Sequence, residues 1–263
     1  MEEETTKFSN ALALASGGLS LVMLFVWQLV VPFSDWGILF VLPFALVLFL
    51  GSLQANAAVY RARVRIALRS DSPYARFLTG QLRAWIHSVL FAAIATFLLA
   101  AFAMSAAPAE WAVLSLIIFS SQFMFSRTDR HFNHHLTAPF ARIGALWITT
   151  VSIGLFYLPI LAWVNWAVVP RPDAITDMSM SQALQMAFDQ LPQRQGFVSE
   201  LLAPFYALDY LKLWIAVHSS SKKLIGFVFC IDAGLVALIA ARAGAVLTSF
   251  IRSAPRAADE KTG

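Results

Sequence analysis

The stretch that decides the fold is residues 61–83, RARVRIALRSDSPYARFLTGQLR, which holds six arginines and a single acidic residue, Asp71. Long apolar runs precede and follow it. A basic loop between two runs that can cross a bilayer is typical of the cytoplasmic side of an integral membrane protein. We expect its arginines to contact lipid headgroups or a cytoplasmic partner, and these are Arg61, Arg63, Arg65, Arg69, Arg76 and Arg83.

The composition of the whole chain agrees with a membrane protein. Hydrophobic residues make up 59% of the 263 residues and charged residues 13%, whereas soluble domains carry about 45–50% and about 25%. The single cysteine, Cys230, excludes a disulfide framework and a multi-cysteine metal site. The net charge of +4 comes from basic residues beside the apolar runs. We therefore predict membrane lipids as partners and no nucleic acid.

The apolar runs predict an all-α integral membrane protein with six transmembrane helices in one polytopic domain, residues 1–263. Each run approaches the ~20 residues that cross a bilayer core. Residues 170–223 interrupt the pattern before the last span, and we expect them to hold an amphipathic helix at the membrane interface. The predicted spans are residues 11–31, 36–55, 84–104, 111–125, 143–169 and 224–251.

A seventh span at residues 197–217 is the alternative. This stretch is apolar but carries Glu200, Asp209 and Lys212, and inserting such charges costs roughly 2.5 kcal/mol or more each. Six spans also place most Lys and Arg, and both termini, on one side. The positive-inside rule makes that side cytoplasmic, and we expect the membrane to be a bacterial inner membrane.

Two charged residues lie inside the last predicted span, Asp232 and Arg242. Ten residues of helix separate them by about 15 Å, so they cannot pair within the helix. Partners from other spans are needed, with Gln28 or Gln122 as polar candidates. Charged groups at this depth mark either a path for an ion or polar substrate, or a structural hydrogen bond to a neighbouring helix.

The same span carries small residues at a spacing of four. Small residues let neighbouring helices approach closely in a membrane. The partner helix belongs either to this chain or to another subunit, and the pattern leaves both open. The residues of this stripe are Ala233, Ala237, Ala241, Gly244 and Ala245.

Histidines form one cluster, HFNHH at residues 131–135. It resembles one histidine box of the membrane fatty-acid desaturases, which implies a divalent metal at His131, His134 and His135. That family needs several boxes, which this chain lacks. A haem held by His87 and His218 requires both at one depth, which only seven spans allow. We therefore predict no metal and no cofactor.

The function classes that remain are not soluble enzymes, because the chain contains no phosphate-binding or nucleophile motif such as G-x-x-x-x-G-K-[ST] or G-x-S-x-G. We expect a non-catalytic subunit of a membrane assembly, such as a secretion, conjugation or envelope complex. The alternative is a permease subunit. Six spans with a basic loop after the second and an apolar segment before the sixth resemble the ABC-2-type exporter permeases, which implies a cytoplasmic ATPase as partner.

Overall fold

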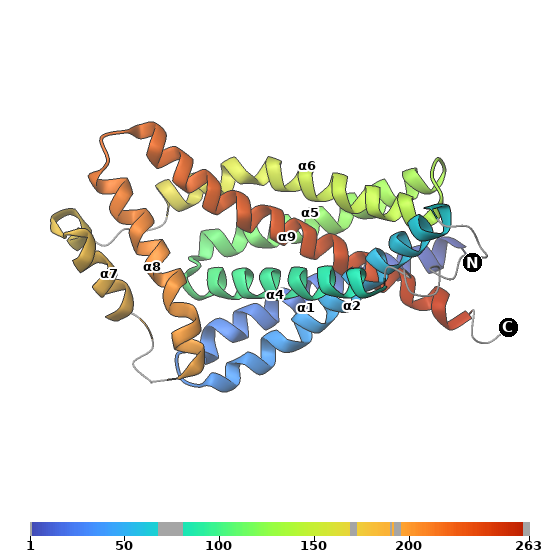
Figure 1. Cartoon of the computed structure of the whole chain (residues 1–263), viewed down its shortest axis with the longest axis horizontal. Helices are drawn as coiled ribbons and strands as arrows, with labels where there is room; N and C mark the ends of the chain where they lie inside the picture. Colours follow the sequence, from blue (N-terminus) through green and yellow to red (C-terminus); the bar gives the residue numbers. More distant parts are fainter. Residues whose placement is uncertain (1, 68–80, 169–172, 190, 192–195, 260–263) are drawn as a thin grey trace.

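The chain forms an elongated bundle of helices in a computed structural model that describes residues 2–67, 81–168, 173–189, 191 and 196–259 (Figure 1). These residues contain α-helices and short 3-10 helices and no strand. Six helices are long and apolar enough to cross a membrane. Their candidate spans are Ala11–Val30, Asp35–Val64, Gln81–Ser105, Pro108–Asn133, Pro139–Ala167 and Lys222–Ser253.

The first two helices, α1 (Glu2–Val30) and α2 (Ile38–Ala67), form a hairpin. The connection contains a one-turn 3-10 helix, η1 (Asp35–Gly37), whose first turn is capped by the Ser34 side chain. Gly37 allows this tight return, because a Cβ there would lie 2.8 Å from a methyl carbon of Val31.

Three further helices follow: α4 (Gln81–Ser105), α5 (Pro108–Asn133) and α6 (Ala138–Ala167). The fourth span is predicted to end near residue 125, but the helix α5 continues beyond that point to Asn133. Polar residues suggested the earlier end, but Ser121 and Ser126 each donate to a carbonyl of their own helix, 2.7 and 2.8 Å away. Such bonds let a helix continue through polar residues.

The centre of the bundle is α9 (Lys222–Asp259), which contacts α1, α2, α4, α5 and α6. Its small side chains make this possible. A Cβ on Gly244 would lie 2.9 Å from the Ile118 carbonyl oxygen of α5, and one on Gly234 would lie 3.1 Å from Leu158 of α6. The backbones therefore approach closely, as in other small-residue helix contacts.

One end of the bundle is covered by three elements that we call the cap: η2 (Asp173–Asp177), α7 (Met180–Asp189) and α8 (Phe197–His218). Figure 1 shows α8 lying across the ends of the long helices. Ile175, Ala187 and Tyr210 form a small apolar core within the cap. The 22-residue α8 is not among the six candidate spans, so the seven-span alternative is not supported.

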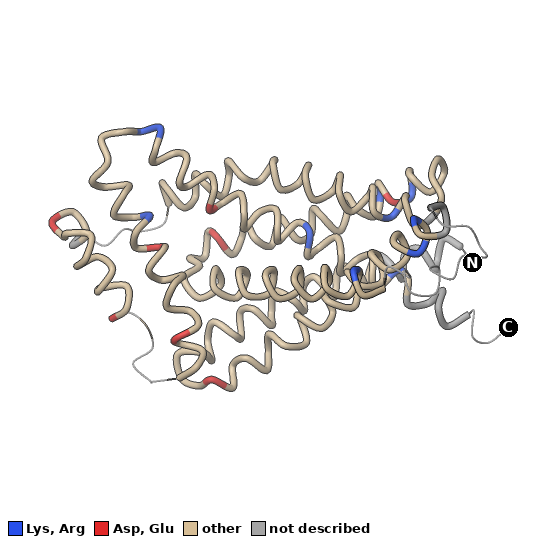
Figure 2. Tube along the Cα trace, in the orientation of Figure 1, with Lys and Arg blue, Asp and Glu red and all other residues tan. Residues whose placement is uncertain are grey.

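Charge divides between the two ends (Figure 2). Most of the described Lys and Arg lie at the end of the bundle where α1 begins and α9 ends, which we call the terminal end. Most of the described Asp and Glu lie at the opposite, cap end. An asymmetry of this kind is what the positive-inside rule describes for the cytoplasmic side of a membrane protein.

Candidate functional site: a charged cluster beneath the cap

Two close charged contacts lie where α8 meets α9. Lys212 Nζ lies 2.9 Å from Asp209 Oδ1 on its own helix and 2.6 Å from Asp232 Oδ2 on α9. The Lys212 side chain is 14% exposed, and the two carboxylate side chains are 38% and 37% exposed. A buried ammonium thus joins the cap to the central helix, and we call these three residues the latch.

Two effects oppose each other at Lys212. Burial disfavours its charged form, but the negative charges of Asp209 and Asp232 and their hydrogen bonds outweigh burial and raise its pKa above the ordinary lysine value. The ammonium also lies 5.5 Å from the centre of the Phe229 ring on α9, in a cation–π contact. Lys212 therefore stays charged at neutral pH.

The cap also contacts α4 in two ways. Ser105 Oγ donates to Asp209 Oδ2 over 3.2 Å. Phe205 of α8 meets Phe97 edge to face, with ring centres 4.7 Å apart. The arrangement holds α8 at two points along its length, one apolar and one charged.

A third acidic residue, Glu110, lies close enough to the latch to interact with its charges and is 7% exposed. It accepts a hydrogen bond from the Ala107 backbone N–H over 2.7 Å, which caps the start of α5. With the amide of Asn165 oriented to satisfy its neighbours, its nitrogen donates to Glu110 Oε1 over 2.6 Å and to the Leu161 carbonyl over 3.2 Å. The carboxylate therefore joins α5 to α6 beneath the cap.

Asp232 has a partner outside its own helix, but that partner lies in the cap and not in another span as predicted, and the predicted partner residues bond elsewhere. Gln28 donates to the Ala106 carbonyl and accepts from the Trp111 indole. Gln122 donates to the Ala13 carbonyl over 2.9 Å. The true partner of Asp232, Lys212, could have been noticed in the sequence, because it is a lysine within an apolar stretch and lies three residues after Asp209.

Arg242 lies apart from this cluster, within the candidate span of α9. It makes no hydrogen bond or ion pair with any residue of the described ranges. Leu238, one turn before it, packs against Gly154 of α6, and Val246, one turn after it, packs against Gly51 of α2. Residues four apart share a helix face, so the half-buried Arg242 faces the seam between α6 and α2.

The small-residue stripe of α9 is covered by helices of this chain. Ala233, Ala237, Ala241 and Ala245 are each 0% exposed, and Gly244 packs on α5. The described helices around it are α5 and α6 together with α1, α2 and α4.

The predicted basic contact region is described only in part. Arg61 and Arg63 are exposed near the end of α2, and the guanidinium of Arg83 lies 5.3 Å from the Tyr60 ring centre. The Arg65 side chain, Arg69 and Arg76 lie outside the described residues. The three arginines that are described therefore sit together at the terminal end.

The histidines are not gathered into a ligand set. α5 ends at Asn133, and the rings of His131 and His135 lie 5.1 Å apart. Among the described residues, no group of three or more His, Cys, Asp or Glu side chains has the arrangement of a metal site. His87 lies in α4 and His218 ends α8 in the cap, so the structure does not bring the two together.

Comparisons with protein families, with curated proteins and with solved structures find no match to this chain.

Proposed function

We propose that this protein is a non-catalytic subunit of a larger membrane assembly, such as a secretion, conjugation or envelope complex. It resides in a bacterial inner membrane, with the terminal end in the cytoplasm and the cap outside. Its partners are membrane lipids and other membrane-protein subunits. The proposal is supported by the six apolar helices, by the division of charge between the ends and, above all, by Arg242.

The observation that carries the proposal is that Arg242 lacks a partner among the described residues. An arginine near the centre of a spanning helix costs about 2.5–3.5 kcal/mol on insertion scales. The cost falls when the guanidinium meets a carboxylate or reaches the headgroups. A side chain on a helix leans toward the helix N-terminus. Arg242 therefore leans toward the cap and away from the nearer, terminal end.

A carboxylate on a helix of another subunit is the partner that these constraints favour. The small-residue stripe of α9 is already buried within the chain, so it is not the contact. The seam between α6 and α2 remains, and a second subunit packed along it would bring an acidic side chain to Arg242. A fully paired arginine would then specify which subunit packs there.

The test uses the intact protein, extracted in mild detergent, with its co-purifying partners identified and its native mass measured. Arg242→Leu should release the partner while the chain itself stays folded, because replacing a buried charge by an apolar residue is often neutral or stabilising. Arg242→Lys should retain part of the complex. Arg63→Leu, at an exposed arginine of the terminal end, is the matched control and should retain all of it.

A wild-type chain that purifies alone under these conditions would contradict the proposal. So would an Arg242→Leu variant that keeps the same partners in the same ratio.

A permease subunit is the second candidate, favoured by one specific observation. A helical cap, α7 and α8, is inserted between the fifth and sixth candidate spans, while the described arginines of the basic stretch, Arg61, Arg63 and Arg83, lie at the opposite end. This layout suits a transporter whose cytoplasmic loop contacts an ATPase. A co-purifying nucleotide-hydrolysing subunit that is lost in an Arg65→Ala, Arg69→Ala double variant would favour it over the scaffold.

A further inference from the structure

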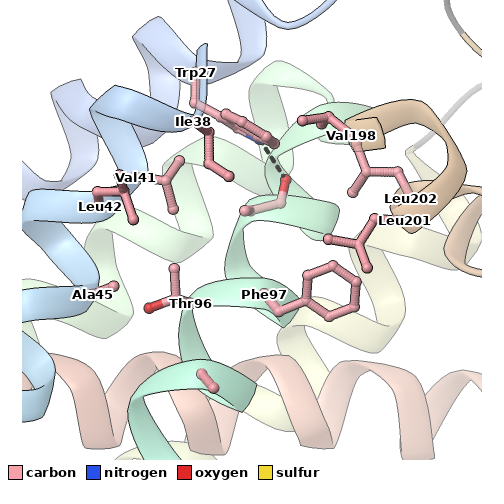
Figure 3. A pocket seen from close by; sticks show the side chains of 12 residues that line it. Trp27, Ile38, Val41, Leu42, Ala45, Thr96, Phe97, Val198, Leu201 and Leu202 are labelled. Carbon is pink, nitrogen blue, oxygen red and sulfur yellow. Dashed lines mark hydrogen bonds between the residues drawn. The ribbon is translucent and has the colours of Figure 1, made fainter. Parts of the chain in front are cut away.

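An apolar pocket lies between the cap and the first two helices at the cap end of the bundle. Its volume is about 170 Å³, and it is lined by residues of α1, α2, α4 and α8 (Figure 3). Trp27 lies near the end of α1, Val41 and Ala45 lie in the first turns of α2, and Val198 and Leu202 reach in from α8. All the long helices that line it are candidate spans.

The lining allows only a hydrocarbon occupant. Its one N–H donor, Trp27 Nε1, already donates to the Ala100 carbonyl over 3.0 Å, within the pocket wall (Figure 3). Thr96 is the other polar lining residue, and its buried hydroxyl oxygen has no hydrogen-bond partner among the described residues. A buried water needs two to four polar partners, so one hydroxyl is too few to hold water, and an apolar cavity of about 150 Å³ holds a benzene-sized ligand. A protein helix, about 10 Å across, is too wide to enter.

The pocket is continuous with the surface that faces lipid in the proposed orientation. Leu42 lines it and is 52% exposed, and Leu201, on the cap side, is 42% exposed. On the same helix as Leu42, the neighbouring Leu39 and Leu46 are 51% and 56% exposed. An acyl chain lying along α2 can therefore enter between Leu42 and Leu201 without crossing a polar group.

We infer that this pocket binds a segment of a phospholipid acyl chain from the leaflet at the cap end, seated against the Trp27 indole beneath α8. This inference rests on the membrane location in the proposed function. It assigns α8 a second role beyond covering the bundle: its first turns close the pocket over the bound chain.

Fluorescence quenching by lipids brominated on the acyl chain tests the inference in reconstituted vesicles. Trp27 is 4% exposed, and bromine quenches only on contact. The Trp27 signal is the difference between wild type and Trp27→Phe. We expect brominated lipid to remove most of that signal. Ala45→Phe should fill the pocket and restore the Trp27 fluorescence. Leu46→Phe, at a position that points to lipid, should leave the quenching unchanged.

Two outcomes overturn the inference. One is a Trp27 signal that brominated lipid leaves unchanged; the other is quenching that persists in both Ala45→Phe and a second plugging variant, Ala93→Leu. The exposed Trp147 and Trp163, 63% and 62% accessible, report separately on the membrane location. If these are not quenched, the proposed function fails; if they are quenched and Trp27 is not, only the pocket assignment fails.

Discussion

Replacing Lys212 with methionine tests the latch most directly. The change removes the ammonium and keeps an unbranched apolar side chain of similar length. Asp209 and Asp232, which lie 2.9 and 2.6 Å from the ammonium nitrogen, then lose the cation between them. We expect α8 to separate from α9 more often, while the six long helices stay packed.

The magnitude follows from the exposure of the three side chains. Removing one partner of a fully buried ion pair costs about 3–5 kcal/mol. Here the carboxylates are 38% and 37% exposed, so solvent screens them and we take about half of that cost, about 2 kcal/mol. Every 1.4 kcal/mol is a tenfold change, so local opening of α8 should become about 30-fold more frequent.

Hydrogen exchange measured by mass spectrometry reads this opening, because it reports local unfolding free energies segment by segment. Peptides of α8 should exchange faster in Lys212→Met, and peptides of α6 should not change. Asp232→Asn and the double variant complete a cycle that isolates the coupling between the two side chains. Lys222→Met removes an exposed lysine at the start of α9 and serves as the control.

If α8 peptides of Lys212→Met exchange their amide hydrogens at the wild-type rate, the latch does not hold α8 to α9. So would strictly additive effects of the two single variants, because they would show that Lys212 and Asp232 do not interact.

Three further predictions concern packing, pH and capping. Gly244→Ala should lower the free energy of unfolding by about 1–3 kcal/mol through overpacking, because the new Cβ would lie 2.9 Å from the Ile118 carbonyl oxygen. The control is Gly226→Ala, whose Cβ would meet nothing within 4 Å and which should leave thermal unfolding unchanged. Burial, with help from a nearby carboxylate, raises the pKa of Tyr206 above its ordinary value of 10.0. The unfolded chain therefore ionises first, so stability of the cap should fall as pH rises above 10.0, and Tyr206→Phe should reduce that fall in a pH series. Glu110→Ala removes the α5 cap and should cost about 1–2 kcal/mol in denaturant titration.

Each of these three results has a clear contradiction. Equal melting temperatures for the two glycine variants would show that α5 and α9 are not in close contact. If Tyr206→Phe loses stability at alkaline pH just as the wild type does, ionisation of Tyr206 does not cause that loss. If Glu110→Ala has an unchanged denaturation midpoint, the Glu110 carboxylate does not stabilise the start of α5.

The long helices could be predicted from the sequence because a bilayer imposes one length on every span. Six apolar runs of that length have few alternative arrangements, and charged residues mark their ends. The predicted fourth span stops short of the end of α5 for a local reason. The polar side chains of Ser120, Ser121 and Gln122 suggested that the apolar helix stops there. In the structure Gln122 is buried and donates a hydrogen bond to the Ala13 carbonyl. The sequence does not show that a polar side chain will find such a partner inside the bundle, so it cannot tell a buried helical position from the start of a loop.

The latch could be predicted only in halves. In the sequence, Lys212 was a charge whose insertion cost argued against a seventh span, and Asp232 was a charge that needed a partner. The two residues are 20 positions apart on different helices, so no local pattern connects them. Their contact depends on α8 folding back over α9 after the turn near residues 219–221, and no local pattern specifies that angle. The position of Arg242 at the seam between α6 and α2 could not be predicted for the same reason, because it depends on which helices pack beside α9.

The central position of α9 bears on how the protein is made. The other five long helices precede it in the chain, so during synthesis the contacts that α9 makes with each of them can form only after those helices have been made. A substitution in α9 would therefore leave the earlier pairs, such as α2 with α4 and α5 with α6, free to pack, and would disturb only the last step of assembly.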